Sequence, residues 1–407
     1  MSNRARFLNL TFSAPKTDLI HWRTPRDKTP RCILPVIVGD SIIHPSKSVK
    51  WLGYWLQDNH STHQHFTKRL HLAKAAWVKV RRLSDAGKGL NPRATRHLSQ
   101  VLIRPTLLYG SEIFSPPGHT LRAMSTFWRK IAIWVTNCFH STSSAAVHSE
   151  SFLTPLPPLI NFIQSKYAIR IVGIHPFINP ASARLPPSAP IHWSPKPPKR
   201  TFPFKNRRGI YAPRAWNSTS KHQSSTHLPV DKVLSRIVHL THIKPFLPRN
   251  YRAPLPPGID TPNLHREAFT PNQLSDILQA DLLSEWSELY SSSSYKYPIP
   301  GKPHTFMRLG KFQALRIHQM RAGQSYLAAQ PTYRQRDQST LCPACESEEE
   351  TFEHASLDCP ARDPMRQTHC PGLSSVSHNS PLWSSFEDIR QFSRFISHAR
   401  INFPTRN

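Results

Sequence analysis

The stretch LCPACESEEETFEHASLDCP, residues 341–360, contains three cysteines and one histidine in the spacing C-x2-C-x8-H-x4-C. The four side chains are Cys342, Cys345, His354 and Cys359. Three thiolates and one imidazole can complete a tetrahedral shell around Zn2+ and leave no position open for a substrate. We therefore expect a structural Zn2+ site here, with an accidental cluster of the four residues as the alternative.

Turn-forming residues flank these candidate ligands. Pro343 and Ala344 separate the first two cysteines and Pro360 follows the last one, which fits a compact loop closed by a metal ion. The acidic residues inside the loop are expected to form a solvated charge run, because thiolate and imidazole suit zinc better than a flexible carboxylate does. These acids are Glu346, Glu348, Glu349 and Glu350.

The composition argues for separate ordered pieces rather than one continuous globule. The 407 residues include 40 prolines, and only 38% of the residues are hydrophobic, which limits the core that the chain can build. Lys and Arg number 53 against 24 Asp and Glu, which gives a formal net charge of +29. Such a chain repels itself unless an anionic partner neutralises it, and nucleic acid, either RNA or DNA, is the leading candidate.

Cysteine usage and hydropathy indicate an intracellular protein, nuclear or cytoplasmic. Four of the six cysteines fall between Cys342 and Cys370, which is typical of a metal site in a reducing compartment rather than of a disulfide framework. No apolar run approaches the roughly 18 residues that a membrane helix needs, so no membrane association is expected. Glycine-rich phosphate loops and nucleophile elbows are missing too, and no small-molecule substrate is expected.

Apolar residues recur at steps of three and four from Thr62 onward, which predicts an amphipathic helix. Its expected core positions are Phe66, Leu70, Ala73, Trp77, Val80 and Leu83. The residues between them are basic. A single such residue is more often solvated surface than a phosphate contact, but the overall excess of positive charge favours nucleic-acid binding. The candidate nucleic-acid-binding residues are Lys68, Arg69, Lys74, Lys79, Arg81 and Arg82.

Two more helices are predicted to pack with the first one into a small bundle. One begins at the cap pair Asn91 and Pro92 and is kinked or ended by Pro105. The other covers residues 121–134. The apolar positions expected in the core are Leu98, Val101, Leu102 and Leu108 in the first of these helices, and Leu121, Met124, Phe127, Trp128, Ile131 and Trp134 in the second.

Composition divides the chain into five consecutive segments. Residues 1–60 suggest strands broken by prolines, including DLIHW (18–22) and ILPVIV (33–38), and residues 61–175 suggest helices. Proline-rich composition starts at Ser151, and residues 176–265 are expected to be a basic, largely disordered linker. Residues 266–370 carry the cysteine array after helices predicted from Pro271 onward and over residues 312–326, and residues 371–407 are a C-terminal tail. The predicted fold class is mainly α with a short N-terminal β segment.

Candidate catalytic carboxylates are sparse. Two-metal phosphoryl transfer needs a cluster of acids that holds Mg2+, whereas adjacent aspartates occur nowhere in this sequence. The acids before Ser151 are scattered singly: Asp18, Asp27, Asp40, Asp58, Asp85, Glu112 and Glu150. Mg2+ is therefore not expected and no catalytic residue is predicted. The histidine group His60, His63 and His65 has no carboxylate or thiol at ligand spacing, and no metal is expected there.

Five motifs follow one another in an order that resembles a known family. They are PKTDLIHW (15–22), VKWLGYWLQDNHSTHQHFTKRLHLAKAAW (49–77), RPTLLYGSEIF (104–114), YAIRIVGIHP (167–176) and the cysteine array, which RIHQMRAGQSYL (316–327) precedes. Over about half of the chain they resemble the carboxyl-terminal part of the reverse transcriptases of non-LTR retrotransposons, most closely the fungal Tad-like group. The resemblance implies residual palm and primer-grip strands in residues 1–60, a thumb-like helical region, and a terminal CCHC zinc knuckle.

Departures from the family decide the expected function. The Tyr-x-Asp-Asp turn and the upstream aspartate that bind catalytic magnesium in the family would lie before Lys16, where this chain has no acid. The carboxylates of a ribonuclease H domain are not found in the proline-rich interval either. The resemblance then implies a nucleic-acid-binding remnant of an RNA-directed DNA polymerase that is inactive alone. Two alternatives stay open: a truncated form of a complete, active reverse transcriptase, and a zinc-stabilised protein-interaction module.

Overall fold

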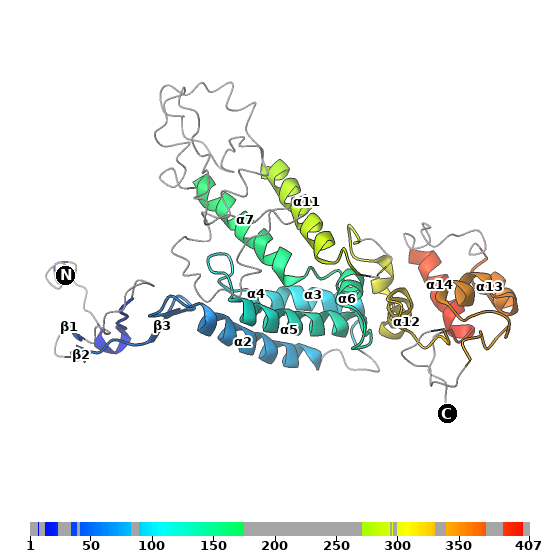
Figure 1. Cartoon of the computed structure of the whole chain (residues 1–407), viewed down its shortest axis with the longest axis horizontal. Coiled ribbons are helices and arrows are strands. Elements are labelled where there is room, and N and C mark those ends of the chain that lie inside the picture. Colours follow the sequence, from blue (N-terminus) through cyan, green and yellow to red (C-terminus); the bar gives the residue numbers. More distant parts are fainter. Residues whose placement is uncertain are drawn as a thin grey trace, which may run out of the picture. The chain divides into compact units, whose positions relative to one another are not determined.

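The computed structural model describes residues 13–22, 34–38, 41–82, 89–174, 271–293, 299–329, 339–371 and 386–401, together with residues 7 and 295. Within these ranges the chain is mainly helical, and its strands lie between Val36 and Gln57 (Figure 1). The predicted fold class, mainly α with a short N-terminal β segment, is confirmed. The predicted linker, residues 176–265, lies outside the described residues.

The chain forms two compact units, each assembled from segments that are distant in the sequence. The first unit takes Met1–Leu72, Leu107–Arg122 and Ile160–Gln279, and the second takes Ala73–Thr106, Ala123–Leu159 and Ala280–Asn407. The division into five consecutive segments stays a prediction. None of the helices in the described ranges combines the length and the apolar character that crossing a bilayer requires.

Two antiparallel hairpins make up the strands. Strand β1 (Val36–Val38) pairs with β2 (Ser41–Ile43), and β3 (Ser48–Trp51) pairs with β4 (Tyr54–Gln57). The second hairpin turns at Leu52 and Gly53, which both have positive φ, as a two-residue hairpin turn requires. The strand predicted at residues 18–22 does not form, because a single bridge from Leu19 to Pro45 is its only pairing in the described part of the chain.

The tip of the β3–β4 hairpin is held by side chains of the helical region. Arg69, in α2 (His63–Arg81), donates a hydrogen bond to the Gly53 carbonyl and lies over the Tyr109 ring at 3.9 Å. The Tyr109 hydroxyl donates to the Leu52 carbonyl at 2.7 Å. The buried His65 takes the Trp55 N–H on Nδ1 and donates from Nε2 to the Tyr109 carbonyl. The helical region therefore holds the β3–β4 hairpin through hydrogen bonds to the hairpin's backbone groups.

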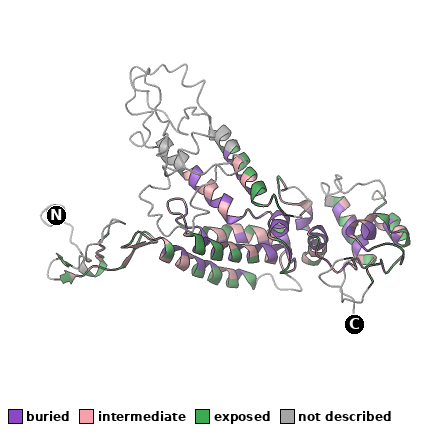
Figure 2. Ribbon diagram, viewed as in Figure 1, coloured by how far each residue is buried: buried purple, intermediate pink, exposed green. Residues whose placement is uncertain are grey.

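Helix α2 begins where the sequence predicts, and its apolar stripe is buried. Phe66, Leu70, Ala73 and Val80 are buried, Trp77 is half-buried, and Leu83 lies outside the described residues. Figure 2 shows exposed residues alternating with less exposed ones along the helix. Helix α5 (Gly118–Thr136) lies beside it, since the Trp77 and Phe127 rings meet edge to face at 5.9 Å.

The second predicted helix is divided into three parts. These are α3 (Pro92–Leu98), a π-helical turn η2 (Ser99–Ile103) and α4 (Arg104–Leu107). Asn91 caps the start, with Oδ1 accepting from the Ala94 N–H at 2.8 Å. Pro105 has no N–H for the carbonyl four residues earlier, and the π turn before it accommodates that loss.

The π turn also changes which side chains of this helix face the core. Val101 and Leu102, which the sequence assigns to the core, are exposed, whereas Ser99 and Ile103 are fully buried. A π turn adds one residue to the helical register, so the apolar positions counted at α-helical spacing rotate toward solvent. The prediction that Val101 and Leu102 belong to the core is wrong for this reason.

Helices α6 (Ser144–Ser151) and α7 (Leu156–Ile174) follow α5. The proline-rich composition that starts at Ser151 predicts linker, yet Pro157 and Pro158 lie in the first turn of α7. Prolines are tolerated there because the first N–H groups of a helix have no partner within the helix. Helix α7 therefore lies within residues 61–175, the part of the chain for which the sequence suggests helices, although its start is rich in proline.

Helix α11 (Pro271–Leu289) starts at the predicted proline, and α12 (Lys311–Arg321) follows a short turn η4 (Thr305–Arg308). The sequence predicts that the second of these helices continues to residue 326. It ends earlier because Gly323 adopts φ +67 and the Gln324 N–H reaches back to the Gln319 carbonyl at 3.1 Å. Glycine in this left-handed position closes a helix.

A fully buried carboxylate, Glu150 of α6, links this helix to residues 295–321. His318 Nδ1 and Arg321 Nε each lie 2.9 Å from its oxygens, and the Tyr295 hydroxyl donates a further hydrogen bond. Burial alone would raise the pKa of Glu150, but Arg321 and the nearby His304 and His318 hold it well below its usual range. These hydrogen bonds and the ion pair compensate the negative charge of Glu150, which would otherwise be very costly to bury.

We predict that Gly110→Ala destabilises the fold by at least about 2 kcal/mol. Gly110 has φ +88, and a Cβ atom there would lie 2.7 Å from His65 Nε2 and 2.8 Å from Tyr54 Cε1. Gly118→Ala is the matched control, because no atom lies within 4 Å of a Cβ at that position. Urea unfolding measures both variants, and equal free energies of unfolding would contradict the prediction.

Acid should destabilise the protein through buried neutral histidines. Burial lowers the pKa of His148 to about 4, while Nδ1 donates to the Leu153 carbonyl at 2.8 Å. Between about pH 6.5 and 4 the unfolded chain binds a proton that the folded chain refuses, so stability falls as the pH falls.

His148→Asn keeps the donor and removes the titration. We expect the slope of the unfolding free energy against pH to be smaller in this variant than in the wild type. The difference between the two slopes should be about 1.4 kcal/mol per pH unit in this range. Urea denaturation at several pH values measures the slope. An unchanged slope would show that His148 does not supply this pH dependence.

Candidate functional site

A tight turn positions the first two cysteines of the array. The Glu346 N–H donates to the Cys342 carbonyl at 2.8 Å, and Glu346 has φ +56. The Cys342 N–H donates to the Glu348 carbonyl at 2.7 Å, and an antiparallel bridge joins Leu341 to Glu349. The backbone thus folds back on itself and brings the two cysteines to one side of the loop.

A π-helical turn, η5 (His354–Asp358), positions the other two side chains. The Cys359 N–H donates to the His354 carbonyl at 2.8 Å, five residues earlier. This wider turn accounts for the x4 spacing, because residues five apart lie over one another in a π turn. The short turn η6 (Pro360–Arg362) and helix α13 (Asp363–His369) follow directly.

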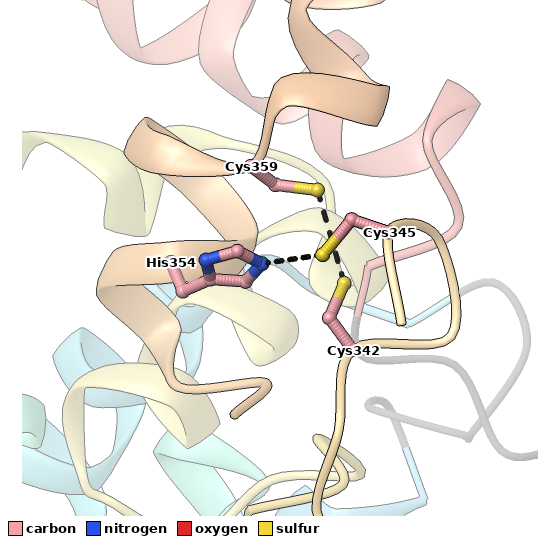
Figure 3. Close-up of side chains that lie close together, drawn as sticks. All are labelled: Cys342, Cys345, His354 and Cys359. Carbon is pink, nitrogen blue, oxygen red and sulfur yellow. Dashed lines mark hydrogen bonds between the residues drawn. The ribbon is translucent and has the colours of Figure 1, made fainter. Parts of the chain in front are cut away.

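The four side chains converge on one point, as Figure 3 shows. Their ligand atoms lie within 4.8 Å of one another. The Sγ atoms of Cys342 and Cys359 are 3.8 Å apart, and the edge of a tetrahedron with Zn–S bonds of 2.3 Å is about 3.8 Å. Cys345 Sγ lies 3.2 Å from His354 Nε2, somewhat shorter than the corresponding edge of about 3.6 Å. The cluster could hold one metal ion.

Glu348 orients the histidine. Its Oε2 lies 2.7 Å from His354 Nδ1, which leaves Nε2 free to face the sulfurs. A carboxylate behind a histidine in this way is the usual outer support of a metal-bound imidazole. Hydrogen bonds from Ser347 lower the pKa of the Cys345 thiol to about 6, and burial raises that of Cys359 to about 11.

The site is closed. Cys342, Cys359 and His354 are buried, and Cys345 is half-buried. All four positions of a tetrahedral shell are supplied by the protein, so a bound ion has no open position for a substrate. Within the described residues this is the only group of three or more cysteine, histidine or acidic side chains whose geometry suits a metal ion.

The acidic run of the loop differs from the prediction. Glu350 is buried, accepts from Arg362 Nη2 at 2.7 Å and takes the Ala328 N–H at 2.9 Å. Glu348 contacts His354, and Glu349 accepts a hydrogen bond from Thr340 Oγ1 at 3.3 Å, so three of the four acids have structural partners. One sequence signal could have indicated these partners, since Arg362 and Arg366 follow the last cysteine one helical turn apart. Arg366 donates to the Cys359 carbonyl at 2.9 Å.

The loop shares a hydrophobic core with two helices. Phe352 and Ala355 from the loop pack with residues of α12 and of α14 (Phe386–His398). Residues 371–407 are expected to be a tail, but they contain α14, whose Ile389, Phe392, Phe395 and Ile396 are fully or almost fully buried. Their spacing of three and four is the helical signal that this expectation overlooked.

The six candidate nucleic-acid-binding residues in and directly after α2 fall into two classes. Lys74, Lys79, Arg81 and Arg82 are exposed. Lys68 lies over the Trp55 ring, and Arg69 is half-buried between Gly53 and Tyr109. The structure therefore gives Arg69 a role in holding the hairpin. The four exposed side chains can meet a phosphate, although the Arg81 guanidinium also lies 5.3 Å from the Trp77 ring centroid.

The other aromatic and histidine candidates have mixed environments. Trp51 is exposed at the hairpin, whereas Trp128 is buried and donates to the Thr154 carbonyl at 2.9 Å. His65 belongs to the hairpin contacts described above, and His63 lies 2.8 Å from Thr120 Oγ1. Of these two tryptophans, only Trp51 is open to solvent.

A search of known protein families, of curated proteins and of solved structures found no match to this chain. The resemblance of the motifs to non-LTR retrotransposon reverse transcriptases stays a prediction.

The cluster predicts a metal content that can be measured. The purified protein should bind about one Zn2+ per chain. We expect the Cys345→Ser variant to lose this zinc. The control Cys370→Ala, at a buried cysteine outside the cluster, should keep the zinc content of the wild type. Cys345 is half-buried, so a serine there fits without creating a cavity. Metal analysis after dialysis measures the stoichiometry. Equal zinc content in wild type and Cys345→Ser would contradict the assignment.

Proposed function

We propose that this chain binds RNA or DNA through basic side chains and that the cysteine cluster holds a structural Zn2+ ion. The observation that carries the proposal is a set of exposed basic side chains, in a chain with a formal net charge of +29. They are Lys74, Lys79 and Arg81 of α2, and Arg82 directly after this helix. Binding at such side chains releases counterions from the phosphate backbone, and this release provides much of the affinity.

The proposed Zn2+ ion would support this function without contacting a substrate. Its four ligands come from one loop, and that loop is part of the core formed with α12 and α14. Metal binding to such a site contributes directly to folding, because the unfolded chain does not present the ligands together. The proposed role of zinc is to order residues 341–371 and thereby complete the core.

The resemblance to non-LTR retrotransposon reverse transcriptases supports nucleic acid as the partner. It also favours a fragment that grips nucleic acid over one that copies it, since residues 1–407 contain no adjacent aspartates. Magnesium-dependent copying is therefore not part of the proposal. Template-directed incorporation of nucleotides by the purified chain would instead favour the alternative, an active reverse transcriptase.

A filter-binding titration against single-stranded RNA and against primer–template duplex tests the proposal. Affinity should fall steeply between about 50 and 200 mM salt. Replacing the four exposed basic residues in and directly after α2 by glutamine should reduce the slope of log affinity against log salt by about 2.8 on the single strand, at about 0.7 per phosphate contact.

The control is a variant with four glutamines at scattered exposed lysines: Lys16, Lys130, Lys166 and Lys302. It has the same net charge as the α2 variant and should keep most of the slope. Equal losses in both variants would contradict a localised site. Absence of binding at low salt would refute the proposal, and binding that survives high salt but not a chelator would favour a zinc-stabilised protein-interaction module.

A further inference from the structure

Helix α14 has one buried face that is mainly apolar and one exposed face that is basic. Its buried face completes the core that contains the cysteine loop. On the opposite side Arg390, Arg394 and His398 are exposed and follow one another at every fourth position. Residues four apart in an α-helix share a face, and eight residues span about 12 Å. The exposed side of α14 is therefore a continuous stripe of two arginines and one histidine, and the exposed Glu387 lies one turn before Arg390.

These arginines differ from the other arginines around them. Arg362 and Arg366 are buried and paired with Glu350 and Asp363, and Arg316 donates to Ser397 Oγ at 3.1 Å. In the ranges that the structure describes, Arg390 and Arg394 form no ion pair. An exposed cation without a carboxylate partner stays available to an anion from outside the chain.

A pair of stacked histidines adjoins the stripe. The rings of His398 and His369, of α13, are 4.2 Å apart and 25° from parallel. His398 Nδ1 donates to the Arg394 carbonyl at 2.8 Å, which fixes the ring. Met365 lies exposed one turn before His369. Flat imidazole rings beside arginines offer a base a surface on which to stack, as single-stranded RNA sites commonly do.

The end of α14 places another arginine in a conformation that favours glycine. Arg400 has φ +52, and the Ile401 N–H bonds to the Ile396 carbonyl at 3.0 Å. This pattern is a helix-closing motif whose left-handed residue is usually glycine, because a side chain there is strained. Arg400 is exposed, so its side chain adds positive charge and no buried contact. Strain retained in this way is a reason to look for a function.

We infer that Arg390, Arg394, His398 and Arg400, with His369, form a second binding surface for single-stranded nucleic acid, the α14 surface. The inference rests on the proposed function and deepens it by adding a contact that the α2 residues do not provide. Phosphates fit the spaced guanidinium groups, and a base fits the stacked imidazoles. A lipid headgroup or an acidic peptide would use the charges but not the stacking surface.

Two variants of the zinc-loaded full-length chain test the inference against a single-stranded RNA 20-mer. Arg390→Gln with Arg394→Gln should reduce the salt slope by about 1.4. Arg400→Gly should weaken binding and at the same time raise Tm by about 2 °C, because glycine relieves the strain. Opposite changes in affinity and in stability would separate a binding role from a structural one. The charge-matched control is Lys16→Gln with Lys302→Gln.

The outcomes separate the inference from the proposed function. Wild-type protein that binds no RNA refutes both. If the α2 variant loses affinity while both α14 variants bind like wild type, the α14 surface is refuted and the proposed function stands. Co-sedimentation with anionic phosphatidylserine vesicles gives a further comparison. If the α14 variants lose vesicle binding to the same extent as RNA binding, the inference is overturned, because the surface would then be a general anion contact.

Discussion

The assembly of the second compact unit depends on the buried carboxylate of Glu150, whose charge must be compensated by partners from another part of the chain. Its partners come from residues 295–321, and it sits in a helix from a distant part of the chain. Removing one partner from such a network leaves a charge without compensation in the interior, which usually costs several kcal/mol. The segment that leads to the cysteine loop is therefore joined to α6 through this carboxylate.

The metal loop depends on the same unit for its own order. Its ligands are near one another in sequence, but the side chains that support the loop extend further, to Arg362, Arg366 and the apolar face of α14. A bound metal ion would thus stabilise the same set of residues as the buried ion pair and the hydrophobic core. Energetic coupling of this kind makes a small module fold as one unit rather than as a metal loop with attached helices.

Periodicity predicted the helices well and their interruptions poorly. The stripe from Phe66 to Val80 and the cap at Asn91 are local signals, and the structure bears them out. The π turn before Pro105 and the early end of α12 at Gly323 depend on backbone conformations that apolar spacing does not report. The four metal-ligand candidates were readable from spacing alone. Their support was not, since Glu350 looks like a solvated acid until Arg362 is folded against it.

The cysteine loop has an electrical character opposite to that of the whole chain. Three thiolates around a divalent ion would leave one unit of negative charge, and the exposed acids Glu346 and Glu349 would add to it. A polyanion would thus be repelled by the metal loop and attracted by the arginines of α14 in the same module. The protein would therefore carry a local separation of charge between the metal loop and α14. This separation would orient an approaching nucleic-acid strand before any contact forms and keep its phosphates away from the thiolates.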